Sequence, residues 1–369
     1  MMKKRYIPAL LLLPAMLALS GCGASGGGSG DAGGDGAVNF KFASYNIPNA
    51  AESIASKQWA EQVADATDGN VTVDFFYQES LLSGSETLQG VADGRADMGF
   101  VATAYYPAEL PLSNVAGVPF VTDNAEAQGR AYLDLYESNE DLRGEWEAQG
   151  VRVMAWAPVS ANIVAVKEPA ESLEDFKGQK IRGYGYVSEA LSMAGVSAVG
   201  ISQTEVYEAL QHGVLDGTSG ASLDIAADRD YQEVAPHFVD INYGNYAVTS
   251  IVINSKKWDA LPEETQQAIT EVSDGYLDLY LEALGEMEVA ACDELLEAGG
   301  EVTIFDKSVT ADWADEAGPA IRAIWAKDVK ATNPDVDTDA FFSAYETAIE
   351  EQQAQSDYQS AMARCAARQ

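Results

Sequence analysis

The stretch GQKIRGYGYV, residues 178–187, places Arg182 at the end of a predicted buried strand in a strongly acidic chain. The chain carries 22 basic and 58 acidic side chains, which gives a formal net charge of −36. A guanidinium stays charged at any relevant pH, and its planar donors match the two oxygens of a carboxylate. Arg182 is therefore a candidate anion ligand, although an ion pair with a nearby acid such as Asp175 explains it equally well.

Two further stretches, SGSE at 83–86 and SQTE at 202–205, have the serine and glutamate spacing of a helix capping box. Each pattern places free backbone N–H groups and the positive end of a helix dipole just after a predicted strand. That position suits an anionic or carbonyl group of a ligand. Ser83, Ser202 and Gln203 are therefore candidate polar contacts, while a well-capped helix without a ligand is the simpler interpretation of either pattern alone.

The sequence contains few side chains of the types that usually catalyse reactions or bind metal ions. His212 and His237 are its two histidines, which disfavours a histidine-rich metal site or a histidine-dependent triad. No pair of carboxylates and no nucleophile stands out for acid–base work. The net negative charge argues against nucleic acid as a partner. We therefore expect no enzyme activity, no cofactor and no metal site.

The first residues predict export. Residues 1–21 combine early basic residues with an apolar run and small residues at its end, which is typical of a secretory signal peptide. The sequence LSGC at 19–22 resembles the lipobox of bacterial lipoproteins, in which the cysteine receives the lipid. Residues 22–37 are rich in glycine and predict a flexible tether. We expect an extracytoplasmic, monomeric protein anchored by lipid on Cys22; a signal peptide with an incidental cysteine is the alternative.

Two other cysteines, Cys292 and Cys365, lie late in the chain, each in a helical pattern. An oxidising compartment allows them to form a disulfide that pins the final helix.

Alternating strand and helix patterns position these residues. The first domain is expected at 38–160, and its first part, up to the strand ADMGFV at 96–101, reads as strand, helix, strand, helix and strand, which predicts a parallel sheet with helices on both faces. Ligands of such sheets bind at the carboxyl ends of the strands. By that rule Asn46, Ser83 and Thr103 are candidate contacts from this first domain. A helical stretch at 124–150 follows this run, and a second α/β domain is expected at 161–245.

The remaining segment, 246–369, is expected to return to the first domain and to end in helices. Residues 262–299 hold an apolar helical pattern that would run about 55 Å if unbroken. Such a helix either bends at Gly275 and Gly285 or spans both domains. Two α/β units that face each other form a cleft, so the predicted fold class is a two-domain α/β fold like that of periplasmic binding proteins, with a long domain-spanning helix.

The sequence of residues 176–217 resembles the signature region of the solute-binding proteins of TRAP transporters (tripartite ATP-independent periplasmic), the DctP family. The matching parts are the Lys-Gly-x-Lys-Ile-Arg segment that ends at Arg182 and the Glu-Val-Tyr-x-Ala-Leu-Gln-x-Gly segment at 205–213. The stretches VADGRADMG and PLSNVAGVPF of the first half are also similar to family members. The resemblance covers nearly all of residues 38–351.

This resemblance implies a fold that closes on a small ligand, with Arg182 gripping the ligand carboxylate. Members that bind sialic acid carry a second arginine where this chain has Asn162, and a Gln-Glu-Asn where it has Thr218–Gly220, so sialic acid is not expected. Asn162 and Ser219 are therefore candidate determinants of specificity. Tyr184, Tyr186 and Trp156 would suit an apolar or aromatic flank of the acid, and core packing is their alternative role.

The function expected from this resemblance is capture of a small organic acid and its delivery to the small and large membrane subunits of a TRAP permease. A binding protein of an ATP-driven importer and an extracytoplasmic enzyme on the same fold are the alternatives. The sequence leaves open which acid is bound and whether a metal ion assists its binding.

Overall fold

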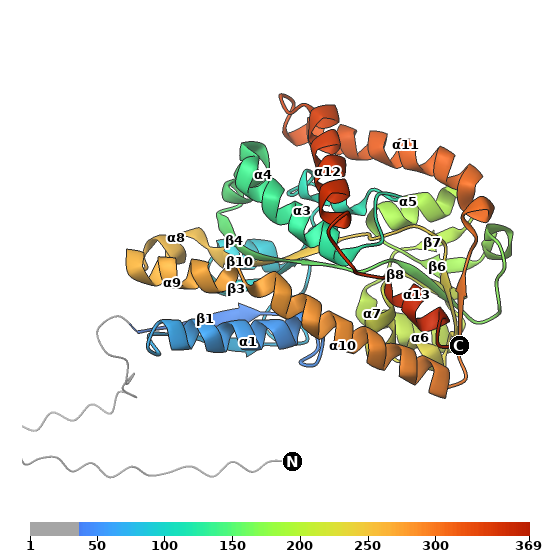
Figure 1. The fold of residues 1–369 in the computed structure, drawn as a ribbon, viewed down its shortest axis with the longest axis horizontal. Coiled ribbons are helices and arrows are strands. Elements are labelled where there is room, and N and C mark those ends of the chain that lie inside the picture. Colours follow the sequence, from blue (N-terminus) through green and yellow to red (C-terminus); the bar gives the residue numbers. More distant parts are fainter. Residues whose placement is uncertain (1–36) are drawn as a thin grey trace, which may run out of the picture.

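The computed structural model describes residues 37–369, which fold around two β-sheets (Figure 1). The first sheet has the strand order β2-β1-β3-β10-β4. In it β1 pairs in parallel with β2 and β3, whereas β10 is antiparallel to both β3 and β4. Its strands are β1 Val38–Ala43, β2 Val71–Phe76, β3 Met98–Ala102, β4 Val151–Pro158 and β10 Val248–Asn254.

The three strands of the predicted run, β1, β2 and β3, form the expected parallel arrangement, and the antiparallel strand β10 is added because the chain crosses between the sheets. β4 leads out of the first sheet into the second, and β10 leads back. A strand that returns from the far sheet enters at the end where its neighbour left, so it must run in the opposite direction.

The second sheet has the strand order β11-β9-β5-β8-β6-β7. β6 pairs in parallel with β7 and β8, and β5 is antiparallel to β8 and β9. The C-terminal segment also contributes β11, parallel to β9, so that segment supplies strands to both sheets. The strands are β5 Ile163–Val166, β6 Lys180–Arg182, β7 Ser197–Val199, β8 Gly217–Ala221, β9 His237–Asp240 and β11 Glu301–Ile304.

Helices cover the first sheet. Buried Trp59 anchors α1 and donates a hydrogen bond from Nε1 to Ser273 Oγ, 3.0 Å away. The helical stretch predicted at 124–150 is two helices, because Asn139 interrupts it and caps the second by accepting from Leu142 N. These helices are α1 Ala51–Ala66, α2 Thr87–Ala92, α3 Ala125–Ser138, α4 Glu140–Ala148 and α8 Ser255–Asp259.

Three short helices accompany the second sheet: α5 Gly185–Met193, α6 Val206–Gln211 and α7 Leu223–Asp228. α5 begins at Gly185, only three residues after β6 ends, so Tyr186 lies in the first turn of a helix. α7 follows β8 directly and packs against the long helix of the 262–299 segment.

The long helical stretch is divided into α9 Glu263–Ser273 and α10 Tyr276–Glu297, with the break at Gly275. Gly285 causes no break, because it lies inside α10. α10 packs against both α1 and α7 (Figure 1), so this helix spans the two sheets.

The C-terminal helices, α11 Lys307–Thr332, α12 Thr338–Gln353 and α13 Ala361–Ala366, tie the halves together. α11 packs on α5, and α12 packs on α3. A disulfide between Cys292 of α10 and Cys365 of α13, with Cα atoms 5.5 Å apart, is the pairing expected from the sequence.

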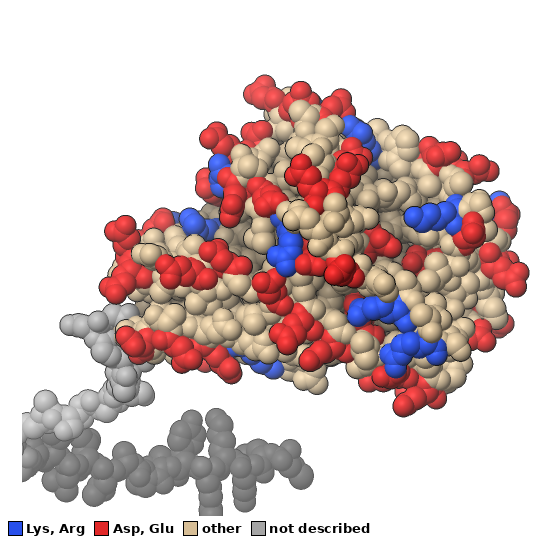
Figure 2. Space-filling view, viewed as in Figure 1, with Lys and Arg blue, Asp and Glu red and all other residues tan. Residues whose placement is uncertain are grey.

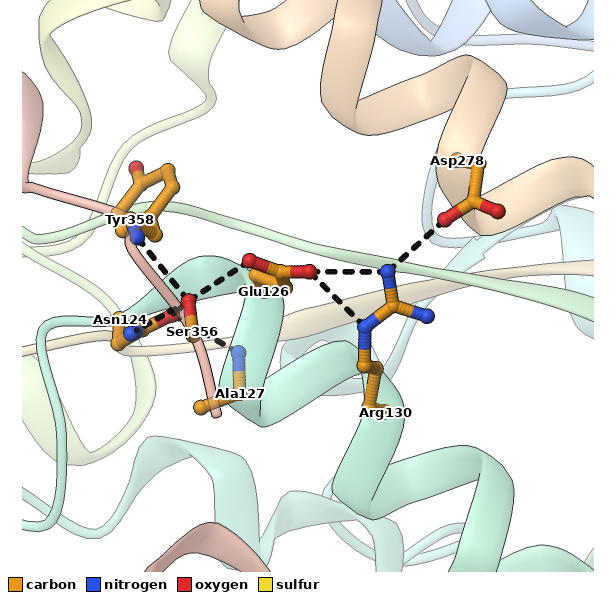
Figure 3. Close-up of polar contacts among 7 residues, drawn as sticks. All are labelled: Asn124, Glu126, Ala127, Arg130, Asp278, Ser356 and Tyr358. Carbon is orange, nitrogen blue, oxygen red and sulfur yellow. Dashed lines mark hydrogen bonds and ion pairs between the residues drawn. The ribbon is translucent and has the colours of Figure 1, made fainter. Parts of the chain in front are cut away.

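A polar cluster fastens the segment between α12 and α13 (Figure 3). Ser356 Oγ donates to Glu126 of α3 at 2.7 Å, and Arg130 bridges the same carboxylate to Asp278 of α10. The contacts join α3, α10 and the C-terminal segment, which lie far apart in the sequence.

Acidic side chains dominate the face shown in Figure 2, with basic side chains scattered among them. No helix within residues 37–369 has the length and apolar character needed to cross a membrane. The predicted signal peptide, the tether up to residue 36 and the lipidation site Cys22 lie outside the described residues.

Candidate functional site

A small cavity of about 40 Å³ lies where the two sheets meet. Its walls come from the loop after β1, the end of β3, the residues that follow β6 and β8, the helix α7 and the segment leading into β10. It is lined by Tyr45, Asn46, Ile47, Ala50, Glu52, Ala102, Tyr105, Val159, Tyr184, Gln203, Gly220, Asp224, Ile225, Asp228, Arg229, Tyr246 and Ala247.

Arg182 lies behind this wall, at the end of β6, and is 1% exposed. Its Nη1 donates to the carbonyl oxygens of Gly220 at 2.8 Å and Ser219 at 3.1 Å, and its Nε to that of Ile201 at 3.3 Å. These carbonyls hold the guanidinium in place without neutralising its charge.

The ion pair with Asp175 that the sequence left open does not form. Asp175 accepts hydrogen bonds from the backbone of Glu171 and Ser172 and so caps its own turn. Among residues 37–369, no carboxylate forms an ion pair with Arg182. A buried cation without an acidic partner is suited to an anionic ligand.

Four tyrosine rings surround the approach to Arg182. The ring of Tyr184 lies 4.7 Å from Arg182 Cζ and stacks on Tyr105 at a centroid distance of 5.6 Å. Tyr45 meets Tyr105 edge-on at 5.9 Å, and Tyr246 meets Tyr184 at 6.2 Å. Burial raises the pKa of all four hydroxyls, so they remain neutral phenols at physiological pH.

Acidic side chains from both halves line the same cavity. Glu52 lies in the first turn of α1, while Asp224 and Asp228 lie on α7 and Arg229 follows them. Burial, reinforced by the charge of Asp224, raises the pKa of both Glu52 and Asp228 to about 7. Burial also raises the pKa of Asp224, whose carboxylate accepts from Ser222 Oγ at 2.6 Å.

Three of the residues selected from sequence line the cavity: Asn46, Tyr184 and Gln203. Asn46 is 9% exposed, and its Nδ2 donates to no atom of residues 37–369. The amide is therefore available to a ligand acceptor.

Asn162 and Ser219 lie behind the cavity wall and are fully buried. Asn162 Nδ2 donates to Ser219 Oγ at 2.9 Å, and Gly220 N donates to Asn162 Oδ1 at 2.7 Å. The pair holds the turn whose carbonyls position Arg182, so both residues act on the site through its arginine.

Ser83, Ser202 and Thr103 do not line the cavity. Ser202 is exposed and completes a capping box with Glu205 at the 3₁₀ turn Gln203–Glu205, as the SQTE pattern predicted. Ser83 bonds to Glu86 in a turn, and α2 begins only at Thr87, so the predicted helix start at Ser83 was wrong. Thr103 is buried and opens a 3₁₀ turn after β3.

Tyr186 and Trp156 are core residues. Tyr186, carried away from the cavity by α5, donates from its hydroxyl to Asp328 of α11 at 3.2 Å. Trp156 is 1% exposed and packs against the rings of Tyr132 and Trp146. The sequence left two roles open for these residues, a ligand contact or core packing. Both residues pack in the core.

Sequence reasoning missed the acidic wall: Glu52, Asp224, Asp228 and the neighbouring Arg229. Its signal was present, because Glu52 opens the helix after the first strand and Asp224 follows the end of β8. In a chain with 58 acidic residues, such positions do not stand out. No cluster of three or more metal-ligating side chains is found between residues 37 and 369.

The chain matches the family model DctP, "Bacterial extracellular solute-binding protein, family 7", over residues 42–328. It is 25% identical over 301 residues to the 2,3-diketo-L-gulonate-binding periplasmic protein YiaO of Escherichia coli K12, an alignment that covers 79% of this chain and 88% of the relative.

Two solved structures of TRAP solute-binding proteins share the fold. One, from a marine metagenome, is specific for aromatic acid ligands and holds 3-hydroxybenzoate; its TM-score is 0.76 at 22% identity, over 86% of this chain and 99% of that one. The other, from Bordetella bronchiseptica, holds (R)- and (S)-mandelate; its TM-score is 0.75 at 24% identity, over 85% and 99% of the two chains.

Proposed function

Since the chain belongs to the DctP family of bacterial extracellular solute-binding proteins, we propose that it captures a small organic acid at Arg182 and delivers it to a TRAP-type permease. The observation that carries the proposal is the buried guanidinium of Arg182, which has a rigid carbonyl scaffold and no acidic partner within residues 37–369. The acids held by the relatives of known structure, 3-hydroxybenzoate and mandelate, agree with a carboxylate at this position.

Capture follows from the division of the site between the two sheets. Asn46, Glu52 and Tyr105 belong to the side of the first sheet, whereas Tyr184 and Gly220 belong to the second. A ligand touches both sets only when the halves are closed, so binding shifts an equilibrium between open and closed forms toward closure. The connections β4 to β5 and β9 to β10, together with α10, are the segments that bend.

The test of the proposal is a thermal-shift screen of organic acids on the mature chain, followed by calorimetry on the variant Arg182→Ala. We expect the variant to lose binding by at least about 100-fold, because a charge-assisted bidentate contact disappears. Arg182→Lys should restore little, since an ammonium cannot reproduce the planar fork. Arg95→Ala, at an exposed position, is the matched control and should bind normally. Near-normal affinity of Arg182→Ala would refute the role of Arg182.

Recovery of the bound acid decides between a binding protein and an enzyme. We expect stoichiometric recovery of unchanged ligand after prolonged incubation, as measured by mass spectrometry. Turnover of the acid would support the enzymatic alternative.

We also propose that lipid on Cys22 tethers the protein to the membrane through the glycine-rich segment. The support is the lipobox-like LSGC sequence at residues 19–22. Cys22→Ser should release the protein into the soluble extracellular or periplasmic fraction, as followed by fractionation and immunoblotting. Continued membrane association of this variant would contradict the lipid anchor.

A further inference from the structure

Building on the proposed function, we propose that the captured acid also bears a positively charged nitrogen, so that its natural ligand is a small zwitterion. The carboxylate binds at Arg182, and the cationic nitrogen lies between Glu52 of α1 and the carboxylates of α7. The class comprises monocarboxylates with an ammonium, quaternary ammonium or amidinium group.

The charged side chains that line the cavity favour a ligand with no net charge. The ionisable wall of the cavity consists of three acids, Glu52, Asp224 and Asp228, and one base, Arg229, with Arg182 directly behind. A plain carboxylate would add a fourth anion to this set, and a dicarboxylate a fifth. A zwitterion adds no net charge and places a cation where the anions gather, which lowers the electrostatic cost of occupying a buried site.

The carboxylate of Glu52 lacks a hydrogen-bond donor from another residue of the described chain. The residue is 6% exposed, lines the cavity, and its carboxylate accepts no hydrogen bond from any other residue within 37–369. By contrast, the carboxylate of Asp224 accepts a hydrogen bond from the hydroxyl of Ser222. Leaving a buried polar group without a partner is costly, and most such groups are paired in native proteins. The missing partner of Glu52 is a donor that the ligand supplies.

The tyrosine rings of the cavity also suit a cationic group. Tyr45, Tyr105, Tyr184 and Tyr246 all line the same cavity as the acids. Their faces carry the negative part of the ring quadrupole, and groups of such rings recognise alkylammonium cations. Rings alone would also suit an uncharged aromatic acid, but rings combined with three carboxylates favour a cation.

The arrangement also couples the cation to closure. Glu52 belongs to the side of the first sheet, and Asp224 and Asp228 to that of the second, so closing the cleft brings like charges together. A cationic nitrogen between them turns this repulsion into attraction. Protons compete for the same carboxylates, because the pKa of Glu52 and of Asp228 is about 7. The other ionisable groups around them, Arg229, Glu288 and the four cavity tyrosines, do not supply the missing cation, since Arg229 offsets only one acid.

Matched pairs of probes test the inference on the mature protein by calorimetry at pH 7.5. Glycine betaine is compared with 3,3-dimethylbutanoate, and proline with cyclopentanecarboxylate, since each pair differs mainly in the charged nitrogen. We expect the zwitterion of a pair to bind, and the plain acid to bind at least tenfold more weakly. Lowering the pH from 8 to 6 should weaken zwitterion binding, because protonated carboxylates no longer attract the nitrogen.

Equal or tighter binding of the plain acids would overturn the inference while leaving the proposed function intact. The inference also fails, and the proposed function stands, if a panel of amino acids and betaines does not bind while plain organic acids do. If no carboxylate of either kind binds, the proposed function itself fails.

The variant Glu52→Gln tests whether Glu52 contacts the ligand or only supports the fold. Glu52→Gln should weaken binding of the zwitterion by roughly 30-fold or more, since one partner of a buried charge pair is lost. It should leave the affinity for the plain acid of the same pair unchanged or higher. Glu61→Gln, at an exposed position on the same helix, is the control and should alter neither. An equal loss for both probes would show that Glu52 only supports the fold, and would refute the inference.

Discussion

At the scale of single residues, the site depends on how closely the backbone of one glycine approaches two side chains. Gly220 has a φ of +70°, and its carbonyl accepts from Arg182 Nη1. A Cβ placed on it would lie 2.9 Å from the ring of Tyr184 and 3.1 Å from the Nη1 of Arg182. Glycine is therefore required here for conformation and for space. Asn162 fixes the same turn from behind.

Gly220→Ala should lower ligand affinity at least tenfold and destabilise the fold by about 1–3 kcal/mol, because the methyl group strains the backbone and displaces Tyr184 and Arg182. Calorimetry and chemical denaturation measure the two effects. Gly144→Ala is the control: it lies in α4 with open space around it and should be neutral or stabilising by under about 1 kcal/mol. Unchanged affinity in Gly220→Ala would show that the close approach is unimportant.

At the scale of elements, the ends of helices decide which side chains meet. The start of α5 at Gly185 turns Tyr186 toward α11, while Tyr184, one residue before the helix, stays at the cavity. The break at Gly275 lets α10 leave the direction of α9 and pass from α1 to α7. The last short helix, α13, depends on α10 for its position, through the disulfide and through the bonds of buried Glu288 to Tyr358 and Arg364.

Removing the disulfide with Cys292→Ser and Cys365→Ser should lower the free energy of unfolding by up to about 4 kcal/mol, because the unfolded chain gains freedom in the loop between the cysteines, whose sequence separation is 73. Denaturant titration with and without reductant measures this loss. Reductant should destabilise the parent protein and leave the double variant unaffected. Two free thiols found by mass spectrometry of the oxidised parent protein would contradict the disulfide.

At the scale of the whole molecule, charge sets the response to pH. The net charge of −36 makes the chain repel itself at neutral pH. Several carboxylates are also buried with raised pKa values. Burial raises the pKa of Glu145 and of Glu288 to about 7, and that of Asp240 to about 6. Hydrogen bonds lower the pKa of some other acids, such as exposed Asp175, and these groups change the stability only at a more acidic pH.

The stability of the protein should fall as the pH rises from about 5 to 7 and level off above that. In this window the buried acids hold protons in the folded state, whereas in the unfolded chain they ionise near pH 4. Each such group contributes about 1–3 kcal/mol, present below its unfolded pKa and lost as the pH passes its folded pKa. Thermal unfolding from pH 5 to 8 should therefore show its highest Tm near pH 5.

The variant Glu145→Gln separates the buried acids from the surface charge. Its side chain cannot ionise, so the decline of Tm between pH 5 and 7 should become shallower. High salt screens exposed charges far more than buried ones, so about 1 M NaCl should raise Tm without removing the remaining slope. A Tm that rises from pH 5 to 7 would contradict this account.

Local pattern determined much of this protein. The Lys-Ile-Arg segment placed Arg182 at the end of a strand, the periodicities marked most strands and helices, and the late cysteines indicated the bond between α10 and α13. The tertiary structure decided which candidates share a cavity, because Asn46 and Tyr184 meet only through the packing of two sheets, whereas Trp156 enters a core. It also decided the antiparallel course of β10 and the meeting of Glu52 with α7. Those features depend on contacts between residues far apart in the chain. The sequence pattern of a single helix or strand does not show which distant residues it will contact.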